Sequence, residues 1–450
     1  MSSVNTNEIS DKKMARRALV GSTSGAIIEW YDFSLYATAS AVIFPKLFFP
    51  NTDPFIATIL SFATFATGFL ARPVGAIIFG HFGDRIGRKN ALIVTLWMMG
   101  LSSAAMGLIP SYDSIGIWAP ILLVLLRLIQ GIGVGGEWAG SILLSMEWGK
   151  KKQQGFMASI PNAGVGAGML LSSAVIGLCI TLGGDSFYTW GWRIPFLASL
   201  LLLVAGLIIR SKIDETPSFR KVQDGEAVSK LPVLDVMKKH PKQILYSALV
   251  KLAEHTPFAI YTTFLINYSI NNYNVSSSYM VNTNTAASFM LCIFIPLFGY
   301  LSDKVGIKRL SRMGIAATLV WGFVFVGLVS TGVHALIVTA MLISMIPFCM
   351  QTGALPALAS QAFPARLRYS GASLGTQIPA IFAGGIAPMV CTYLIQATGT
   401  IWSIGIYIAI VSVLGLIGTS KLKNLSEQES TLSAGNESSM ILKTPEDVKA

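Results

Sequence analysis

Long apolar runs alternate with short polar segments along almost the whole chain. Each run has about 20 residues, the length that an α-helix needs to cross the ~30 Å hydrocarbon layer of a membrane. The pattern predicts twelve such spans: 18–44, 55–80, 91–110, 116–146, 156–182, 191–209, 244–266, 279–301, 310–331, 335–362, 371–397 and 401–420. The sequence therefore predicts an all-α integral membrane protein with twelve transmembrane helices.

One long polar connection, residues 210–243, divides the spans into six and six. The expected organisation follows the polar segments. A cytoplasmic N-terminus, a first six-helix half, a cytoplasmic central loop, a second six-helix half and a cytoplasmic tail occupy residues 1–17, 18–209, 210–243, 244–420 and 421–450. Both termini are then on the same side of the membrane, because each half crosses it an even number of times.

The composition supports a membrane protein. Only 12% of the residues are charged, against about 25% in soluble domains, which argues against a soluble enzyme. A net charge of +11 without a basic polar domain also argues against nucleic-acid binding. Of the 33 basic residues, 28 fall in segments on one side of the predicted membrane. This is the positive-inside asymmetry, and it predicts that both termini are cytoplasmic.

The sequence offers no candidate cofactor site. The four cysteines lie inside apolar runs, without a C-x-x-C pair or a nearby histidine. Small buried hydrophobes are the simpler interpretation. We therefore expect no metal, no disulfide and no cofactor, and a monomer whose partners are the lipid bilayer and a small-molecule substrate.

An internal repeat joins the two halves. Residues 80–89 and 299–308 occupy the second loop of their respective halves, and Gly, Asp and Gly recur at a constant offset of 219. The glycines permit a tight turn, and Asp84 and Asp303 are each expected to cap the following helix. Duplicated halves of six spans are typical of secondary transporters.

The motifs resemble those of the major facilitator superfamily. Residues 80–89 match its G-x-x-x-D-R-x-G-R-K pattern, and residues 127–133 resemble its R-x-x-Q-G-x-G motif. More narrowly, residues 29–33, 72–75, 135–138, 192–196 and 368–373 resemble the metabolite:proton symporter family. That resemblance implies transport of shikimate, 2-oxoglutarate, citrate, other dicarboxylates, or proline and betaine. In the superfamily, the first, fourth, seventh and tenth spans line the central cavity.

Ionisable side chains inside a span are functional candidates by default, because they are costly in lipid. Counting ~1.5 Å per residue from the span ends places Glu29, Asp32, Arg127, Lys251 and Glu254 near the middle of the membrane. Together with the resemblance, this suggests one aqueous pocket. Gln130 shares a helix face with Arg127, and the aromatic candidates for lining the pocket are Tyr31, Tyr36 and Tyr261.

The central hypothesis is that Asp32, supported by Glu29 or Glu254, carries the proton, while Arg127 and Lys251 attract an anionic substrate. Desolvation and a nearby cation shift a carboxylate's pKa in opposite directions, so wetting and substrate binding can switch such a group. The alternative is a fixed buried ion pair between Asp32 and Arg127 that only holds two helices together.

A second set of charges lies nearer the cytoplasm by the same depth count. These residues are predicted to form an inner gate of salt bridges that closes when the site faces outward: Arg72, Asp84, Arg85, Arg88, Glu137, Asp303 and Arg368. Static anchoring among lipid headgroups is the competing interpretation, chiefly for Arg85.

The resemblance and the interior charges together imply a bacterial inner-membrane symporter that uses the proton gradient to import a small organic acid by alternating access. The alternative substrate is a zwitterionic osmolyte such as proline or betaine; residues 421–450 lack the heptads of osmosensing relatives, which lowers that expectation. A membrane enzyme would need a nucleophile with a base, or metal ligands, and no such group is evident. A channel would not need duplicated switch loops.

Overall fold

The protein is a bundle of long helices, as its apolar runs predict. The structure is a computed structural model and describes residues 6–147, 151–184, 186–212 and 232–426. The first half contains α1 (Thr6–Val42), α2 (Phe44–Phe48), α3 (Pro54–Ile86), α4 (Arg88–Gly107), α5 (Tyr112–Ile115), α6 (Trp118–Glu147), η1 (Lys151–Gln153), α7 (Gln154–Gly183), η2 (Phe187–Gly191) and α8 (Arg193–Ser211). The second half contains α10 (Pro232–Lys239), α11 (Pro241–Ala259), η3 (Ile260–Phe264), α12 (Leu265–Tyr273), α13 (Ser277–Val305), α14 (Ile307–Ser330), α15 (His334–Gln361), η4 (Ala365–Leu367), α16 (Arg368–Ala380), η5 (Ile381–Ile386), α17 (Ala387–Thr398) and α18 (Trp402–Lys421).

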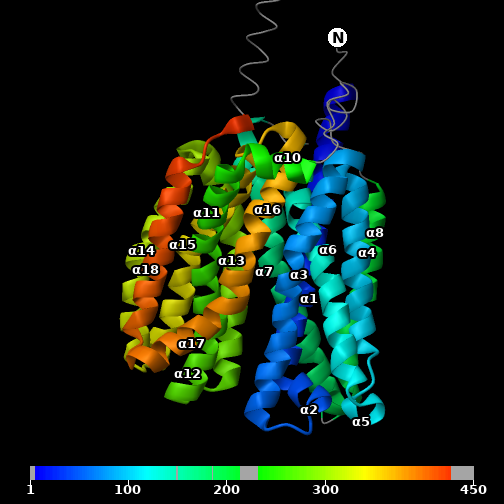
Figure 1. Cartoon of the computed structure of the whole chain (residues 1–450), viewed down its shortest axis with the longest axis vertical. Coiled ribbons are helices and arrows are strands. Elements are labelled where there is room, and N and C mark those ends of the chain that lie inside the picture. The colour runs from blue at the N-terminus through cyan, green and yellow to red at the C-terminus, as the bar shows by residue number, and fades with distance from the viewer. Residues whose placement is uncertain (1–5, 148–150, 185, 213–231, 427–450) are drawn as a thin grey trace, which may run out of the picture.

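Within the described residues, ten helices are long and apolar enough to cross a membrane. The two other predicted crossings correspond to α1 and to α11 with its continuation through η3 and α12. Both run the length of the bundle (Figure 1). They are less apolar because they carry the ionisable residues Glu29, Asp32, Lys251 and Glu254. The predicted all-α membrane fold is confirmed, and the described residues contain no strand.

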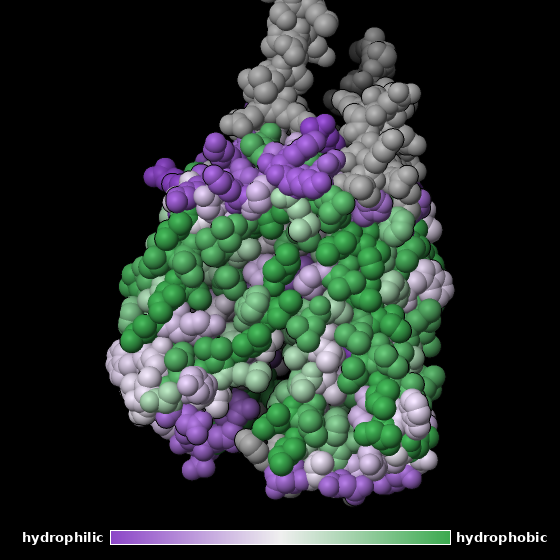
Figure 2. All heavy atoms as spheres, viewed as in Figure 1, coloured by the Kyte–Doolittle hydropathy of each residue, from purple (hydrophilic) through white to green (hydrophobic). Residues whose placement is uncertain are grey.

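The outer surface matches a bilayer. A broad apolar belt surrounds the bundle, and polar residues gather at both ends (Figure 2). The end that carries α10 and the repeat loops is called the basic end; Lys89, Lys238, Lys239 and Lys308 lie there. Both described termini reach this end (Figure 1). The predicted N-terminus, central loop and tail lie partly outside the described residues, at 1–5, 213–231 and 427–450.

The two halves meet through two helix pairs. α7 of the first half packs along α13 of the second, and α3 packs along α16. At the opposite end of the molecule the space-filling view shows a hollow between the halves (Figure 2). The halves therefore touch at the basic end and diverge at the other, which is one of the arrangements that alternating access requires.

The repeat loops turn as the sequence predicts. Gly87 and Gly306 begin the helices that follow, with φ of 107° and 102°. L-residues with a side chain rarely adopt this region, so both positions need glycine. These turns bring the Asp84 and Asp303 segments back toward the other half of the protein.

Two long crossings of the second half contain a π-helical turn. In one, η3 follows Pro257 of α11; in the other, η5 follows Pro379 of α16. Proline removes a backbone donor and perturbs the helix before it, and π-turns frequently occur at functional sites. The second of these turns, η5, faces the first half: the Cβ of an alanine at Gly384 would meet Phe69 of α3.

Candidate functional site

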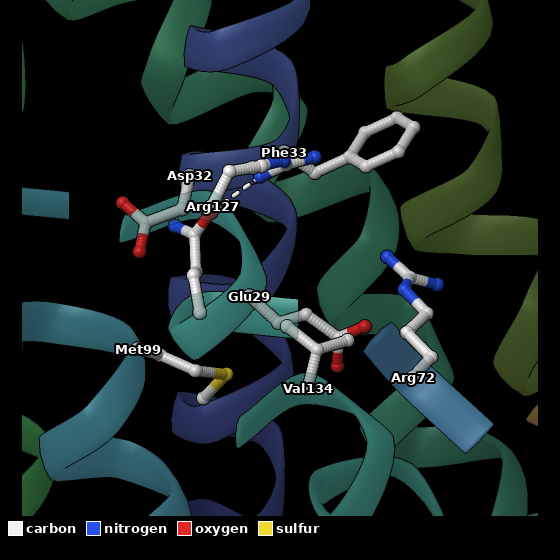
Figure 3. A pocket seen from close by; sticks show the side chains of 8 residues that line it. Glu29, Asp32, Phe33, Arg72, Met99, Arg127 and Val134 are labelled. Carbon is white, nitrogen blue, oxygen red and sulfur yellow. Dashed lines mark hydrogen bonds between the residues drawn. The ribbon is translucent and has the colours of Figure 1, made fainter. Parts of the chain in front are cut away.

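A small buried cavity lies inside the first half. It has a volume of about 10 Å³, enough for one water molecule. α1, α3, α4 and α6 contribute its lining residues: Glu29, Asp32, Phe33, Arg72, Met99, Arg127, Gln130 and Val134 (Figure 3). Four of the eight are ionisable, which is a high concentration of charge for the interior of a membrane protein.

Asp32 and Arg127 lie in this cavity but do not form a close pair. Ser199 Oγ donates to Asp32 Oδ1 over 2.7 Å, and Asp32 Oδ2 is buried without a hydrogen-bond partner. Arg127 donates to Gln130 and lies over the rings of Tyr36 and Phe65, while its Nε is also unpaired. Among the described residues, no ion pair within 4.0 Å joins Asp32 to Arg127. The predicted alternative of a fixed buried ion pair is therefore wrong for this conformation.

Glu29 and Arg72 form a second layer, nearer the basic end. Both are more than nine-tenths buried, and Figure 3 shows their charged groups turned toward the same space. The predicted place of Arg72, beside the Asp84 loop, is wrong. α3 continues for 14 residues beyond Arg72, or ~21 Å, so Arg72 lies well inside the bundle.

The cluster of the second half is more completely paired. Lys251 Nζ donates to Glu254 Oε2 over 2.7 Å, and Thr352 Oγ1 of α15 donates to Glu254 Oε1 over 2.7 Å. His255 Nδ1 lies 3.6 Å from the same carboxylate. Both oxygens of Glu254 thus have partners, in contrast to Asp32.

Aromatic contacts join the two clusters across the halves. Trp30 of α1 packs edge-on against His255 and Phe258 of α11. Lys251 lies 5.7 Å from the ring centroid of Trp138 on α6. The five ionisable residues predicted to converge do so as two neighbouring groups, separated by this aromatic layer.

Glu137 has a different partner from those of the predicted gate. It pairs with Arg210 of α8 inside the first half, and both side chains are 1% exposed. Thr95 and Ser141 also donate to its carboxylate, and Arg210 donates to the Leu92 carbonyl. The depth count placed Glu137 correctly toward the basic end, since Arg210 lies in the last turn of α8 and Leu92 near the start of α4. The ion-pair partner of Glu137, however, lies within the first half and not across the predicted gate. Arg210, which the sequence assigned to the central loop, is the last-turn residue of α8.

Two of the three predicted pocket tyrosines are core residues. Tyr31 donates through its hydroxyl to the Pro195 carbonyl over 2.7 Å. Tyr261 is fully buried in the core of the second half, against Phe325. Only Tyr36, which bonds Thr64 and underlies Arg127, supports the cavity. In a long apolar run, the sequence does not show whether a tyrosine lies on the side of the helix that faces the cavity or on the side that packs in the core.

The contacts at the basic end lock the halves together. Asp303 of α13 accepts from the backbone N–H groups of Gly155 and Phe156, over 2.7 and 2.9 Å. It therefore caps α7 of the other half, and the prediction that it caps its own next helix is wrong. The reason is that the Gly306 turn carries the chain away, while the unpaired N-terminus of α7 lies close by.

Further contacts reinforce this closure. Tyr369 Oη donates to the Gly136 carbonyl over 2.6 Å, and Arg368 Nη1 lies 3.6 Å from Glu147 Oε1. Both contacts cross from α16 to α6. Of the predicted gate residues, Asp84, Arg85 and Arg88 have side chains that lie outside the described part of the structure.

Replacing Asp303 by Asn is expected to loosen the basic end. Asn keeps one acceptor oxygen but loses the charge and the second acceptor that Asp303 uses. That loss costs ~1–2 kcal/mol, which would lower the ratio of closed to open conformations about 5- to 30-fold. Spin labels at Asn90 and Arg309, both exposed at this end, would report a longer and broader distance distribution. Asp113→Asn at the opposite end is the control; an unchanged distribution in Asp303→Asn contradicts a clamp role.

Sequence reasoning missed several polar partners in the interior. Ser103, Ser199 and Thr352 hydrogen-bond Gln130, Asp32 and Glu254, respectively. Single serines and threonines in apolar runs are common in membrane helices. They carry little signal until the helices that face each other are known.

The bundle and its charged cavity define a membrane transporter rather than an enzyme. The chain belongs to the Major Facilitator Superfamily, whose sequence model matches residues 24–378. Its relatives include the shikimate transporter of Escherichia coli K12, 38% identical over 88% of this chain and 91% of that protein. The proline/betaine transporter of the same organism is 32% identical over 91% of this chain and 83% of that protein.

These relatives confirm the resemblance to metabolite:proton symporters. The inner membrane metabolite transport protein YhjE of E. coli K12 is a further relative, 36% identical over 89% of this chain and 92% of its own length. Among solved structures, the proton:xylose symporter XylE bound to 6-bromo-6-deoxy-D-glucose superposes with a TM-score of 0.72. It is 16% identical, and the match covers 92% of this chain and 97% of XylE. The protein is a multi-pass membrane transporter of the type found in bacterial inner membranes.

Proposed function

We propose that the protein imports a small organic acid together with a proton, and that Asp32 carries the proton. The observation that supports this most directly is the state of the Asp32–Arg127 layer. A buried carboxylate oxygen and a buried guanidinium nitrogen both lack partners in the described structure. Buried polar groups are normally satisfied, so a proton and a ligand are the natural partners here.

The candidate proton-carrying carboxylates differ in the hydrogen bonds that their oxygens accept. Glu254 is bonded on both oxygens by Lys251 and Thr352, which favours a structural role in the second half. Asp32 has one open oxygen. Lys251 is likewise occupied by Glu254, so Arg127 is the better candidate to attract the anion, with Gln130 holding its guanidinium in place.

The direction of transport follows from the proposed orientation. The basic end faces the cytoplasm by the positive-inside rule, so the hollow in Figure 2 opens to the outside. Substrate and proton enter from there. Neutralising the cavity would then favour release of the Asp303 clamp, opening the basic end and delivering both to the cytoplasm. No cofactor is needed, since the proton gradient supplies the energy.

A zwitterionic osmolyte is the second candidate, because the relatives include proline/betaine transporters. A quaternary ammonium group would need open aromatic faces. Phe65, Tyr36 and Phe69 instead lie under the protein's own Arg127 and Arg72. This arrangement favours the anion.

Competition uptake tests the substrate class. Vesicles containing the protein and an imposed pH gradient are expected to accumulate shikimate or another small acid. Unlabelled shikimate, 2-oxoglutarate or citrate should compete, and proline and betaine should not. Competition by proline and betaine alone would contradict the organic-acid proposal while leaving the transporter class unchanged. Stimulation of exchange by substrate on the far side would exclude a channel.

A further inference from the structure

Arg72 is a buried cation without a hydrogen-bond acceptor. Arg72 is 7% exposed and lines the cavity. It makes a cation–π contact with Phe69, whose ring centroid lies 4.4 Å from the guanidinium carbon. In the described part of the chain, no residue accepts a hydrogen bond from it. A guanidinium has five donors, and those of Arg72 face the cavity, where a ligand or water can accept from them.

Glu29 is the natural partner of Arg72 within the protein, but its carboxylate and the Arg72 guanidinium do not come into contact in the described structure. Arg72 and Glu29 line the same cavity, and Glu137, Lys251 and Arg210 are further charged side chains near Glu29. Even so, no ion pair within 4.0 Å forms between Glu29 and Arg72 among the described residues. Figure 3 shows the carboxylate and the guanidinium facing a shared space.

The two arginine layers of the cavity therefore differ. Arg127 is held by Gln130 and by two aromatic rings. Arg72 has one ring and no hydrogen bond, so it keeps its planar fork available for a carboxylate. An acid group entering the cavity would compete with Glu29 for that fork.

We propose that Arg72 is a ligand for the substrate's carboxylate and that Glu29 competes with the substrate for it. This inference rests on the proposed organic-acid function and adds a second proton-linked position. A proton from outside binds a Glu29 carboxylate oxygen, and the substrate carboxylate replaces Glu29 as the counter-ion of Arg72. The charge of the layer is unchanged by the exchange, so proton and anion bind together without an added charge in the membrane.

The test measures the KM for radiolabelled shikimate in proteoliposomes at several external pH values. In the wild type, acidification protonates Glu29, frees Arg72 and lowers KM. Arg72→Gln should raise KM about 10- to 100-fold, the worth of a charge-assisted hydrogen bond, and Arg72→Lys should recover part of it. Glu29→Gln should give a low KM with a much weaker dependence on external pH.

Two controls keep the outcomes distinct. Arg193→Gln removes an arginine that is not among the lining residues of the cavity. Arg193 donates to the Thr189 and Ile109 carbonyls and lies over the Trp192 ring, so KM should stay at the wild-type value. In an Arg72→Gln background, Glu29→Gln should have little further effect on KM, because the competition has already been removed.

Specific results would overturn the inference. An Arg72→Gln variant with wild-type KM, or a Glu29→Gln variant with the wild-type pH dependence of KM, shows that Arg72 does not bind the substrate in competition with Glu29. If the wild type itself accumulates no organic acid, the proposed function fails as well. The two kinds of failure can be told apart, because the variant results are obtained with a protein that still transports the acid, whereas the failure of the proposed function is seen in the wild type itself. Because KM does not depend on the amount of protein, poor expression does not imitate any of them.

Discussion

Replacing Asp32 by Asn is expected to abolish proton-driven accumulation while exchange of substrate across the membrane continues. The amide cannot take up the proton, so the gradient no longer drives the cycle. Each pH unit is worth about tenfold in concentration for one coupled proton, so the wild type should concentrate substrate accordingly. The variant should only equilibrate it. Arg127 and the second-half cluster remain, which leaves a path for the substrate.

The measurement pairs uptake under an imposed pH gradient with counterflow at equal pH. Asp113→Asn, an exposed acid at the end away from the repeat loops, is the matched control and should behave as wild type. Accumulation at the wild-type level in Asp32→Asn would refute the coupling role. Loss of both activities with normal folding would assign Asp32 to substrate binding instead.

Breaking the Glu137–Arg210 pair is expected to destabilise the protein strongly. Truncating Glu137 to Leu leaves Arg210 uncompensated inside the first half, and breaking one side of a buried pair costs about 3–5 kcal/mol. Arg210 also donates to the Gly21 and Leu92 carbonyls, so part of its network survives. The double replacement Glu137→Leu with Arg210→Met should recover much of the stability, because no charge is then left unpaired.

Thermal unfolding in detergent, followed by size-exclusion chromatography, would show the difference. Glu29→Gln is the comparison at similar burial: Glu29 forms no close ion pair, so its loss should change stability by about 1 kcal/mol or less. A Glu137→Leu variant as stable as wild type, but altered in transport, would instead support the gate that the sequence predicted for Glu137.

The fold was largely accessible from the sequence. Hydrocarbon imposes a minimum helix length and excludes most charges, so the apolar runs marked every crossing. The repeat at an offset of 219 and the need for glycine at positions 87 and 306 identified the two halves. The main errors were at boundaries, as with Arg210, because a helix continues past the membrane wherever its end packs on neighbours.

The site was accessible only in part. The cost of charge in lipid selected Glu29, Asp32 and Arg127 correctly as interior residues. Depth counted from one end of a span misplaced Arg72, because α3 is longer than the membrane requires. For Glu137 the depth was right, but spacing along the chain could not identify Arg210 of α8 as its partner.

The sequence by itself determined that this chain is a twelve-crossing transporter of the major facilitator type with ionisable groups in its interior. Hydrophobic length and the repeat are local properties of the chain. Only the tertiary structure decided which polar groups face each other: Arg210 with Glu137, Asp303 with the start of α7, and Arg72 with Glu29. Pairing depends on how each helix is rotated and offset against its neighbours, and that emerges from packing between segments far apart in the chain.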